Sequence, residues 1–503
     1  MTIIFENNTF KYEVESVCKL FFPCVLFQHE YDTPWEERDD VIVASLSRGA
    51  EETVLTGLVR LQGKECTASQ TVLNEDFHYE EECERLLCVA VYHALEQATG
   101  IHVTWGVMTG IRPVKQMNYW IEKGKSMEEV ERIFAEDYLV TPQKIDLCKK
   151  TRKNQVEIID ASKPNSYSLY VSIPFCPSRC SYCSFVSSSI AAPKAKALVG
   201  EYVEKLCEEI RYMGKQVEGL GLQLETAYIG GGTPTTLSAD QLTQLTQCMR
   251  ESFPLDQAKE FTIEAGRADT ITRDKLEAIK QARATRISIN PQTFNDQVLK
   301  NIGRKHTAQQ VVDCYRMAQE MGFEDINMDF IAGLPGDTYE SFCKTIDEAV
   351  MLNPTNITVH TLTIKRSSDL FHAGELDESL PQMEISKMVE YAYQALTQAG
   401  YEPYYLYRQK NTLQNLENVG YCKPGYEGLY NIYIMEEIHT ILAAGASAVS
   451  KLIRKKSQKV QRIFNYKYPF EYNRDFADIL ERKNAIREFY TVLKAESPIS
   501  LEK

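Results

Sequence analysis

The chain has 503 residues, 44% of them hydrophobic and 25% charged, and it carries a formal net charge of −14. This composition is ordinary for a globular protein. The chain is long enough for about three domains at roughly 150 residues each. The acidic balance argues against a nucleic-acid-binding protein, because that function needs basic patches for the phosphates.

The N-terminal segment has the pattern of neither a signal peptide nor a membrane span. Its apolar stretch, residues 18–27, is short and contains Lys19 and Pro23. The 14 cysteines are scattered apart from one cluster, which is typical of reduced thiols rather than of a disulfide framework. We therefore expect a cytoplasmic protein with no membrane span.

Residues 1–160 are predicted to form an N-terminal extension, mixed α/β at first and then helical. Two strand-like runs, 41–47 and 53–61, flank a tight turn. Residues 80–100 carry an apolar stripe at helical spacing and end in a glycine, so we expect an amphipathic helix there. The polar, turn-rich stretch 159–168 marks the end of this extension.

Residues 161–400 alternate between strand-like and helical patterns. Strands are predicted at 168–175, 225–232, 260–266, 285–292, 326–333 and 356–362. Six βα units in series indicate a parallel sheet with right-handed crossovers. Polar and glycine-rich motifs recur at the carboxyl end of strand after strand, which favours a complete or partial TIM-like βα barrel over a doubly wound sheet. Residues 401–503 are expected to form a C-terminal α+β domain.

Three cysteines follow the first of these strands, namely Cys176, Cys180 and Cys183. A Cys-x3-Cys-x2-Cys loop can hold three corners of an iron–sulfur cube and leave the fourth iron open. Open coordination separates a reactive metal centre from a structural one. A zinc site usually has a second pair of ligands, and the sequence contains no other Cys-x2-Cys or His-x3-His pattern. The pattern therefore favours a reactive iron–sulfur centre over structural zinc.

A Cys-x3-Cys-x2-Cys loop after the first strand of a βα barrel resembles the radical S-adenosylmethionine (SAM) enzymes. The resemblance implies a [4Fe–4S] cluster with Cys176, Cys180 and Cys183 as its ligands and as catalytic residues. It also implies SAM on the open iron, where one electron cleaves it to a 5′-deoxyadenosyl radical.

Further motifs follow in order at the predicted strand ends. They are GGGTPT at 230–235, Glu264 in FTIEAG, NPQTFN at 290–295 with Arg304 beyond it, and Asp329 followed by GLPG at 333–336. With the opening YVSIPFC they resemble the oxygen-independent coproporphyrinogen III oxidase branch of the radical SAM enzymes, over residues 167–455. The WGVMTGIRP loop at 105–113 resembles the coproporphyrinogen dehydrogenase-like subgroup, which has an N-terminal extension.

The resemblance assigns cofactor-binding residues position by position. Positions that contact SAM are matched by Tyr170, Gly231, Gly232, Thr233 and Glu264, with Tyr182 as an aromatic side chain beside the cofactor. Positions that contact a second SAM in the oxidase are matched by Gln292, Arg304 and Asp329. On local grounds alone, a triple glycine can be only a tight turn, and a strand-end glutamate can be only a solvated charge.

Two positions depart from the oxidase pattern. Ser172 stands where the opening motif has histidine. Phe185 stands where the oxidase has an additional cysteine, two residues after the third ligand. Phenylalanine at this place resembles the heme-chaperone relatives, which keep the fold and the cluster but not the decarboxylation.

Three functions stay open at this point. The leading one is oxidative decarboxylation of two propionates of coproporphyrinogen III to vinyl groups, which yields protoporphyrinogen IX in heme synthesis. The second is a chaperone that binds and delivers heme, and the third is a SAM-dependent methyl transfer to heme. All three imply a tetrapyrrole partner, and the radical reaction implies a reducing electron donor such as flavodoxin or ferredoxin.

Candidate tetrapyrrole contacts are cations for the propionates and histidines for a heme iron. The cations are Arg112, Lys365, Arg366 and Arg408, and the histidines are His360 and His439. Arginine suits a carboxylate because its planar fork donates two parallel hydrogen bonds. Each of these side chains also has an ordinary alternative, as a solvated surface charge or a hydrogen-bonded histidine.

Overall fold

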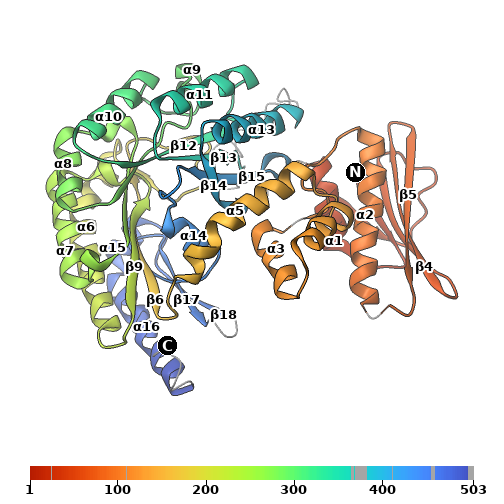
Figure 1. Cartoon of the computed structure of the whole chain (residues 1–503), viewed down its shortest axis with the longest axis horizontal. Helices are drawn as coiled ribbons and strands as arrows, with labels where there is room; N and C mark the ends of the chain where they lie inside the picture. Colours follow the sequence, from red (N-terminus) through yellow and green to blue (C-terminus); the bar gives the residue numbers. More distant parts are fainter. Residues whose placement is uncertain are drawn as a thin grey trace. The chain divides into compact units, whose positions relative to one another are not determined.

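The computed structural model describes residues 1–23, 25–76, 78–108, 110–363, 368, 382–409, 412–454 and 459–496. The chain forms two compact units. The first comprises Met1–Lys149 and Tyr407–Glu417, and the second comprises Lys150–Leu406 and Asn418–Lys503. Residues 407–417 thus belong with the N-terminal unit although they are distant from it in sequence. Figure 1 labels the elements of both units.

The first unit is a five-stranded sheet with helices. Its strands lie in the order β2-β1-β3-β4-β5, with bounds Thr2–Glu6 (β1), Gln28–Tyr31 (β2), Val41–Arg48 (β3), Glu52–Leu61 (β4) and Lys64–Leu73 (β5). Its helices are Lys11–Phe21 (α1), Tyr79–Thr99 (α2), Pro113–Glu122 (α3), Met127–Arg132 (α4), the π-helical Ile133–Asp137 (η1) and the start of Pro142–Asp160 (α5). The predicted β3–β4 hairpin and the α2 helix are confirmed, and β1, α1 and β5 are additional.

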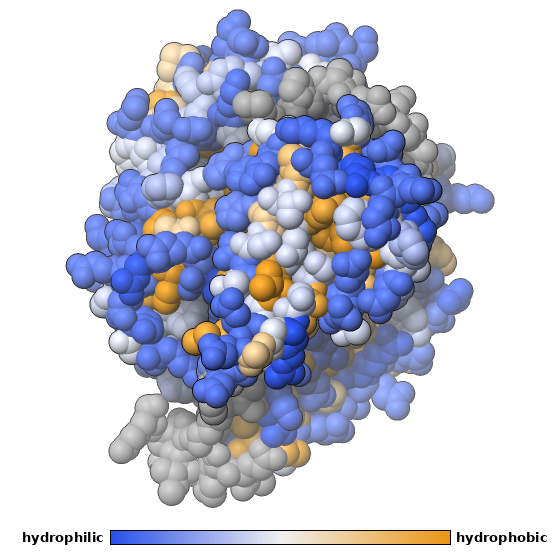
Figure 2. All heavy atoms as spheres, turned by 90° about the vertical axis from the view of Figure 1, so that its right-hand side faces the viewer, coloured by the Kyte–Doolittle hydropathy of each residue, from blue (hydrophilic) through white to orange (hydrophobic). Residues whose placement is uncertain are grey.

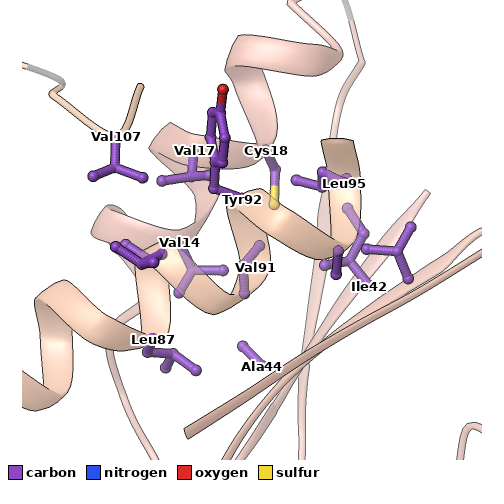
Figure 3. Packing of buried hydrophobic residues seen from close by; sticks show 14 of the residues in the cluster. Val14, Val17, Cys18, Ile42, Ala44, Leu87, Val91, Tyr92, Leu95 and Val107 are labelled. Atoms are coloured by element: carbon purple, nitrogen blue, oxygen red, sulfur yellow. The ribbon is translucent and has the colours of Figure 1, made fainter. Parts of the chain in front are cut away.

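Helices α1 and α2 cover one face of this sheet. Val14 and Val17 of α1 meet Leu87 and Val91 of α2 above Ile42 of β3, and all five side chains are buried (Figure 3). Burying such a side chain contributes about 1.5–3 kcal/mol. The apolar stripe that predicted α2 is therefore the surface that holds this unit together.

The second unit is built on an eleven-stranded sheet in the order β14-β15-β13-β12-β11-β10-β9-β6-β16-β17-β18. Its central strands are parallel: Ser166–Ile173 (β6), Gln223–Gly231 (β9), Glu260–Gly266 (β10), Arg286–Ile289 (β11), Asp325–Ala332 (β12), Asn356–Thr361 (β13) and Thr440–Ala444 (β16). The six predicted strands are confirmed in their chain order. Strand β16, which pairs with β6, was not predicted.

The remaining strands extend the sheet on both sides. They are Glu402–Arg408 (β14), Glu417–Cys422 (β15), Val449–Arg454 (β17) and Lys459–Phe464 (β18), and β15 and β17 run antiparallel to their parallel-sheet neighbours. In the described part of the chain the sheet has two open edges, at β14 and β18. The fold is therefore the partial form of the predicted barrel.

Helices connect the parallel strands on one side of the sheet (Figure 1). They are Pro193–Val217 (α6), Ala239–Ser252 (α7), Arg273–Gln281 (α8), Asp296–Asn301 (α9), Ala308–Glu320 (α10), Tyr339–Leu352 (α11) and Gln382–Gln398 (α13). Capping boxes start α7 at Ser238 and α10 at Thr307. The C-terminal helices are Leu429–Met435 (α14), Pro469–Arg474 (α15) and Phe476–Glu496 (α16).

Short 3-10 turns and one small strand pair complete the unit. The turns are Pro234–Thr236 (η2), Leu255–Gln257 (η3) and Ala268–Thr270 (η4), and the pair is Phe175–Cys176 (β7) with Ser188–Ser189 (β8). A further turn, Leu413–Asn415 (η5), belongs to the first unit. Among the described residues, no helix is both long enough and apolar enough to cross a membrane. The face drawn in Figure 2 is mostly hydrophilic, with apolar side chains in separate small areas.

The parallel strands alternate between an apolar and a polar side. In β6, the buried Leu169 and Val171 alternate with Ser168 and Tyr170. Polar side chains on neighbouring strands are hydrogen-bonded to one another: Thr226 donates to Ser168 at 2.7 Å, Asn327 to Ser288 at 2.9 Å, and Thr358 to Asn327 at 3.1 Å. Because side chains alternate with a period of two, the helices cover the apolar side and the polar side is left to line a site.

Candidate functional site

The three predicted cysteine ligands lie on one loop beyond the carboxyl end of β6. Strand β7 pairs with β8, and the Ile190 amide donates to the Cys176 carbonyl at 2.9 Å, so both ends of the loop are fixed. The Cys183 amide donates to the Cys180 carbonyl at 3.1 Å, which forms a turn between them. Cys180 is buried, Cys176 and Cys183 are half-buried, and all three are free thiols.

The triple glycine packs directly against the start of this loop. The Gly232 amide donates to the Ile173 carbonyl at 2.8 Å, and the Thr233 amide donates to the Phe175 carbonyl at 2.7 Å. A Cβ at Gly232 would lie 2.6 Å from the Phe175 oxygen and 3.0 Å from Cys176 Sγ. Glycine is needed here for close approach, so the motif does more than form a turn.

The segment after α9 supports the loop from the other side. The Ser181 amide donates to the Ile302 carbonyl at 3.2 Å. Arg304 is buried, and its guanidinium donates to Tyr182 Oη at 3.1 Å and to the Asn290 carbonyl at 2.5 Å. The structure thus brings two predicted residues, Tyr182 and Arg304, into contact beside the cysteines.

A further cation beside the loop, Arg267, was not predicted. Arg267 Nη1 donates to the Ser178 carbonyl at 3.1 Å and to Ser178 Oγ at 2.9 Å, and it lies 3.8 Å from Cys180 Sγ. The one sequence signal for it is its place three residues after Glu264, at the same strand end.

Glu264 lies in a wall of tyrosines on the polar side of the sheet. Tyr228 Oη donates to Glu264 Oε1 at 2.6 Å. Tyr228 stacks on Tyr430 of α14, with ring centroids 4.7 Å apart, and Tyr170 stacks on both at 6.1 and 6.2 Å. Burial raises the pKa of Glu264 to about 8, although the Tyr228 hydrogen bond opposes the rise. Predicted residues Tyr170 and Glu264 therefore share one wall, to which α14 contributes.

Gln292, just beyond β11, meets Asp329 within the neighbouring strand β12. The Gln292 amide donates to the Asp329 carbonyl at 2.9 Å, and Gln292 has a φ of 69°. A glutamine in this left-handed region costs free energy, and such strain is concentrated at functional sites. Asp329 Oδ1 accepts a hydrogen bond from Asn327 at 2.8 Å and lies 4.0 Å from His360 Nε2.

The donor set of the loop fits an iron–sulfur cube. Thiolates are the soft ligands that such clusters use, and Arg267 and Arg304 supply positive charge beside them. The described residues hold no group of three or more His, Cys, Asp or Glu side chains that converges on a single metal ion. In a cube each thiolate binds its own iron, so such convergence is not needed.

The chain is similar to known radical SAM proteins. Residues 170–349 match the radical SAM superfamily. The oxygen-independent coproporphyrinogen-III oxidase-like protein HemZ of Bacillus subtilis is 36% identical over 89% of this chain and 90% of its own length. The heme chaperone HemW of Lactococcus lactis is 31% identical over 68% of this chain and 84% of its own length.

A solved structure shows the same fold. Coproporphyrinogen III oxidase (HemN) of Escherichia coli, described as a radical SAM enzyme, has a TM-score of 0.50 at 23% identity, over 64% of this chain and 72% of that one. The partial barrel with its site at the carboxyl strand ends is that of a radical SAM protein. Within that superfamily, the chain belongs to the family of the oxidase-like HemZ and the heme chaperone HemW. Its cofactors are accordingly a [4Fe–4S] cluster and SAM.

The WGVMTGIRP loop has a structural role in the first unit. Trp105 Nε1 donates to Glu417 Oε2 at 2.6 Å, and Lys144 forms a buried ion pair with the same carboxylate. Arg408 lies over the Trp105 ring at 5.1 Å and donates to the Met108 and Gly110 carbonyls. This loop therefore binds residues 407–417 to the N-terminal unit.

Of the four candidate cations for the propionates, the two described ones differ in their surroundings. Arg408 is 2% exposed, so its guanidinium supports the loop and is not placed to bind a propionate. Arg112 lies at the start of α3 and is half-buried. Lys365 and Arg366 lie outside the described residues.

The two candidate histidines differ in burial and in their hydrogen bonds. His439 is fully buried, and its two ring nitrogens bond Ser162 Oγ at 2.7 Å and Ser168 Oγ at 2.9 Å. His360 is half-buried on the polar side of β13. His439 is therefore a hydrogen-bonded core histidine, and His360 keeps its place as a candidate.

The C-terminal residues also support the cysteine segment. A Cβ at Gly445 would lie 2.5 Å from the Ser172 carbonyl oxygen. Tyr202 Oη donates to that same oxygen at 2.8 Å and accepts from the Ala446 amide at 2.8 Å. The backbone just before the cysteine loop is thus held from α6 and from the turn after β16.

Proposed function

We propose that the protein is a radical SAM enzyme that oxidatively decarboxylates two propionates of coproporphyrinogen III to vinyl groups. The observation that carries the proposal is the packing of Gly232 against the start of the Cys176–Cys183 loop, with Glu264 beside Gly230, at the carboxyl ends of the adjacent strands β6, β9 and β10. The similarity to HemZ over 89% of the chain supports the substrate class.

Each site residue has a role in this proposal. Cys176, Cys180 and Cys183 bind the cluster through their thiolates. Backbone groups of Gly231, Gly232 and Thr233 and the carboxylate of Glu264 bind SAM, with Tyr170 and Tyr182 beside it. Gln292, Arg304 and Asp329 line the next part of the polar side, where a second SAM or the substrate binds.

The chemistry requires one radical per propionate. When bound, the cluster and SAM would supply a 5′-deoxyadenosyl radical able to take one hydrogen atom from the propionate β-carbon. The substrate radical then loses CO2 and passes one electron to an acceptor, which leaves a vinyl group. The contribution of this chain is to position the β-carbon and to keep water away from the radical.

We also propose an electron donor and a location. Reduction of the cluster needs a low-potential donor such as flavodoxin or ferredoxin. A cytoplasmic location is supported by the free state of the described cysteines, because thiols persist where glutathione and thioredoxin keep them reduced.

A heme chaperone is the second candidate function. Phe185, at the position of the additional oxidase cysteine, is 63% exposed in the cysteine loop. His360 offers a half-buried imidazole on the polar side of the sheet, which suits an axial heme ligand. The similarity to HemW supports this alternative.

An anaerobic turnover assay tests the first function. The cluster is reconstituted, and SAM, a reductant, coproporphyrinogen III and an electron acceptor are added before mass spectrometry of the products. We expect conversion of two propionates to vinyl groups that depends on SAM and is absent in Cys180→Ala. Cleavage of SAM with an unchanged porphyrinogen would overturn the substrate, and stoichiometric heme binding would then favour the chaperone.

A further inference from the structure

Arg267 connects the end of β10 to the cysteine loop. Its Nη1 group donates to both oxygens of Ser178 and lies 3.8 Å from Cys180 Sγ. Its side chain is 4% exposed. A cation shielded from water in this way acts on its neighbours more strongly than a surface arginine.

The orientation of Arg267 is fixed from behind by a carboxylate. Arg267 Nε and Nη2 donate to the two oxygens of Asp269 at 3.0 and 2.8 Å. The His306 ring, fully buried, has its Nδ1 3.5 Å from Asp269 Oδ1. Burial would raise the pKa of Asp269, but His306 and Arg267 outweigh it and hold that pKa well below its usual range. The carboxylate is therefore ionised, and two of the guanidinium nitrogens are committed to it.

This arrangement leaves Nη1 alone to face the loop. The same nitrogen holds the Ser178 backbone and approaches the sulfur of Cys180, a proposed cluster ligand. The Asp269 carboxylate lies on the far side of the guanidinium, so the positive end of the pair is directed at the sulfur. Charge and hydrogen bonds at ligand sulfurs are among the factors that set the reduction potential of an iron–sulfur cluster.

We propose that Arg267 is a positioning residue that sets the reduction potential of the cluster, with Asp269 tuning its effect. One-electron reduction adds a negative charge to the cluster, and the nearby guanidinium stabilises that charge. The proposal rests on Cys176, Cys180 and Cys183 as ligands, and it goes beyond the substrate question because it holds for an oxidase or a chaperone.

Opposite changes of charge provide the test. Arg267→Gln, Asp269→Asn and the control Arg273→Gln, on the exposed start of α8, are reconstituted anaerobically in the full chain. Iron and sulfide contents are measured, and the cluster is titrated with dithionite in the absence of SAM while its reduced form is followed by electron paramagnetic resonance. Dithionite supplies the single electron, and no bond is made or broken.

The expected shifts have opposite signs. In Arg267→Gln the reduction equilibrium becomes at least tenfold less favourable, so the reduction potential becomes about 59 mV more negative for a one-electron couple. In Asp269→Asn the reduction potential shifts to less negative values, because the guanidinium charge is no longer compensated. Arg273→Gln leaves it unchanged. A purely structural role would not produce shifts of opposite sign.

Several outcomes would overturn the inference. A fully loaded Arg267→Gln protein with the wild-type potential would do so. If Arg267→Gln takes up no cluster, Asp269→Asn decides: an unchanged or more negative potential contradicts the proposal. A wild-type chain that binds no cluster, or a Cys180→Ala chain that binds it fully, would instead contradict the ligand assignment.

Discussion

Tyr228 Oη donates a 2.6 Å hydrogen bond to Glu264 Oε1 between the neighbouring strands β9 and β10. Glu264 is the residue proposed to accept a hydrogen bond from SAM, so Tyr228 controls both its direction and its ionisation. The pKa of Glu264 is raised to about 8, because burial and, to a smaller extent, the charge on Asp329 outweigh the Tyr228 hydrogen bond that lowers it.

SAM affinity is therefore expected to depend on pH through Glu264. If SAM binds the carboxylate, affinity should rise about tenfold between pH 7 and pH 9 as the group loses its proton. Isothermal titration calorimetry of the reconstituted protein measures this. Glu264→Gln should bind SAM weakly and without this dependence, and Tyr228→Phe should move the midpoint to higher pH. A flat profile in the wild type would contradict the role of Glu264.

The raised pKa of Glu264 also predicts that the stability of the SAM-free protein depends on pH. The folded-state pKa lies above the usual value of 4.5, so the contribution of Glu264 to stability is complete below pH 4.5 and is lost as pH rises towards 8. We expect Tm to fall over this window in the wild type relative to Glu264→Gln. Calorimetry of both proteins checks this, and parallel Tm profiles would refute the raised pKa.

Gly232→Ala should impair cluster assembly. The new Cβ would meet the Phe175 and Ile173 carbonyl oxygens at 2.6 and 2.9 Å and displace the start of the cysteine loop. Iron content after reconstitution should fall several-fold. Gly200→Ala in α6 is a matched control, because nothing lies within 4 Å of its Cβ, and it should be neutral or stabilise by about 0.5–1 kcal/mol. Equal iron contents in the two variants would show that close approach at Gly232 is unimportant.

Glu417→Ala should strongly destabilise the N-terminal unit. It leaves the buried Lys144 ammonium without its carboxylate and Trp105 Nε1 without its acceptor. Loss of one partner of a buried ion pair costs about 3–5 kcal/mol, which urea unfolding should detect in its first transition. Glu65→Ala is the control, because that ion pair with Arg60 lies at the surface and contributes roughly 0–1 kcal/mol. Similar losses in both variants would contradict the buried pair.

His360→Ala tests the axial ligand that the heme-chaperone function would use. If the protein delivers heme through an axial histidine on the polar side of β13, the variant should bind heme at least tenfold more weakly and with a changed Soret band. His102→Ala, exposed in the first unit, is the control. Unchanged heme spectra in His360→Ala would remove this histidine as a ligand.

The sequence by itself determined the parallel sheet and the order of its motifs. Strand periodicity, helix caps and the cysteine spacing are local properties, so β6, β9, β10, β11, β12 and β13 could be predicted in chain order. Right-handed crossovers bring the carboxyl ends of such strands to one edge. For this reason Cys180, Gly232 and Glu264 could be assigned to a common site from the sequence alone.

Only the tertiary structure decided which side chains meet across long separations. Arg267 lies against Cys180, 87 residues away, and Trp105 bonds Glu417, 312 residues away. Tyr430 of α14 stacks on Tyr228, and β16 joins the sheet beside β6. Such pairs leave no local sequence pattern. The residues that flank an arginine or a tyrosine in the sequence do not reveal whether its side chain contacts a distant residue or is exposed to solvent. Packing of the whole chain fixes the partner, and with it the role of the residue.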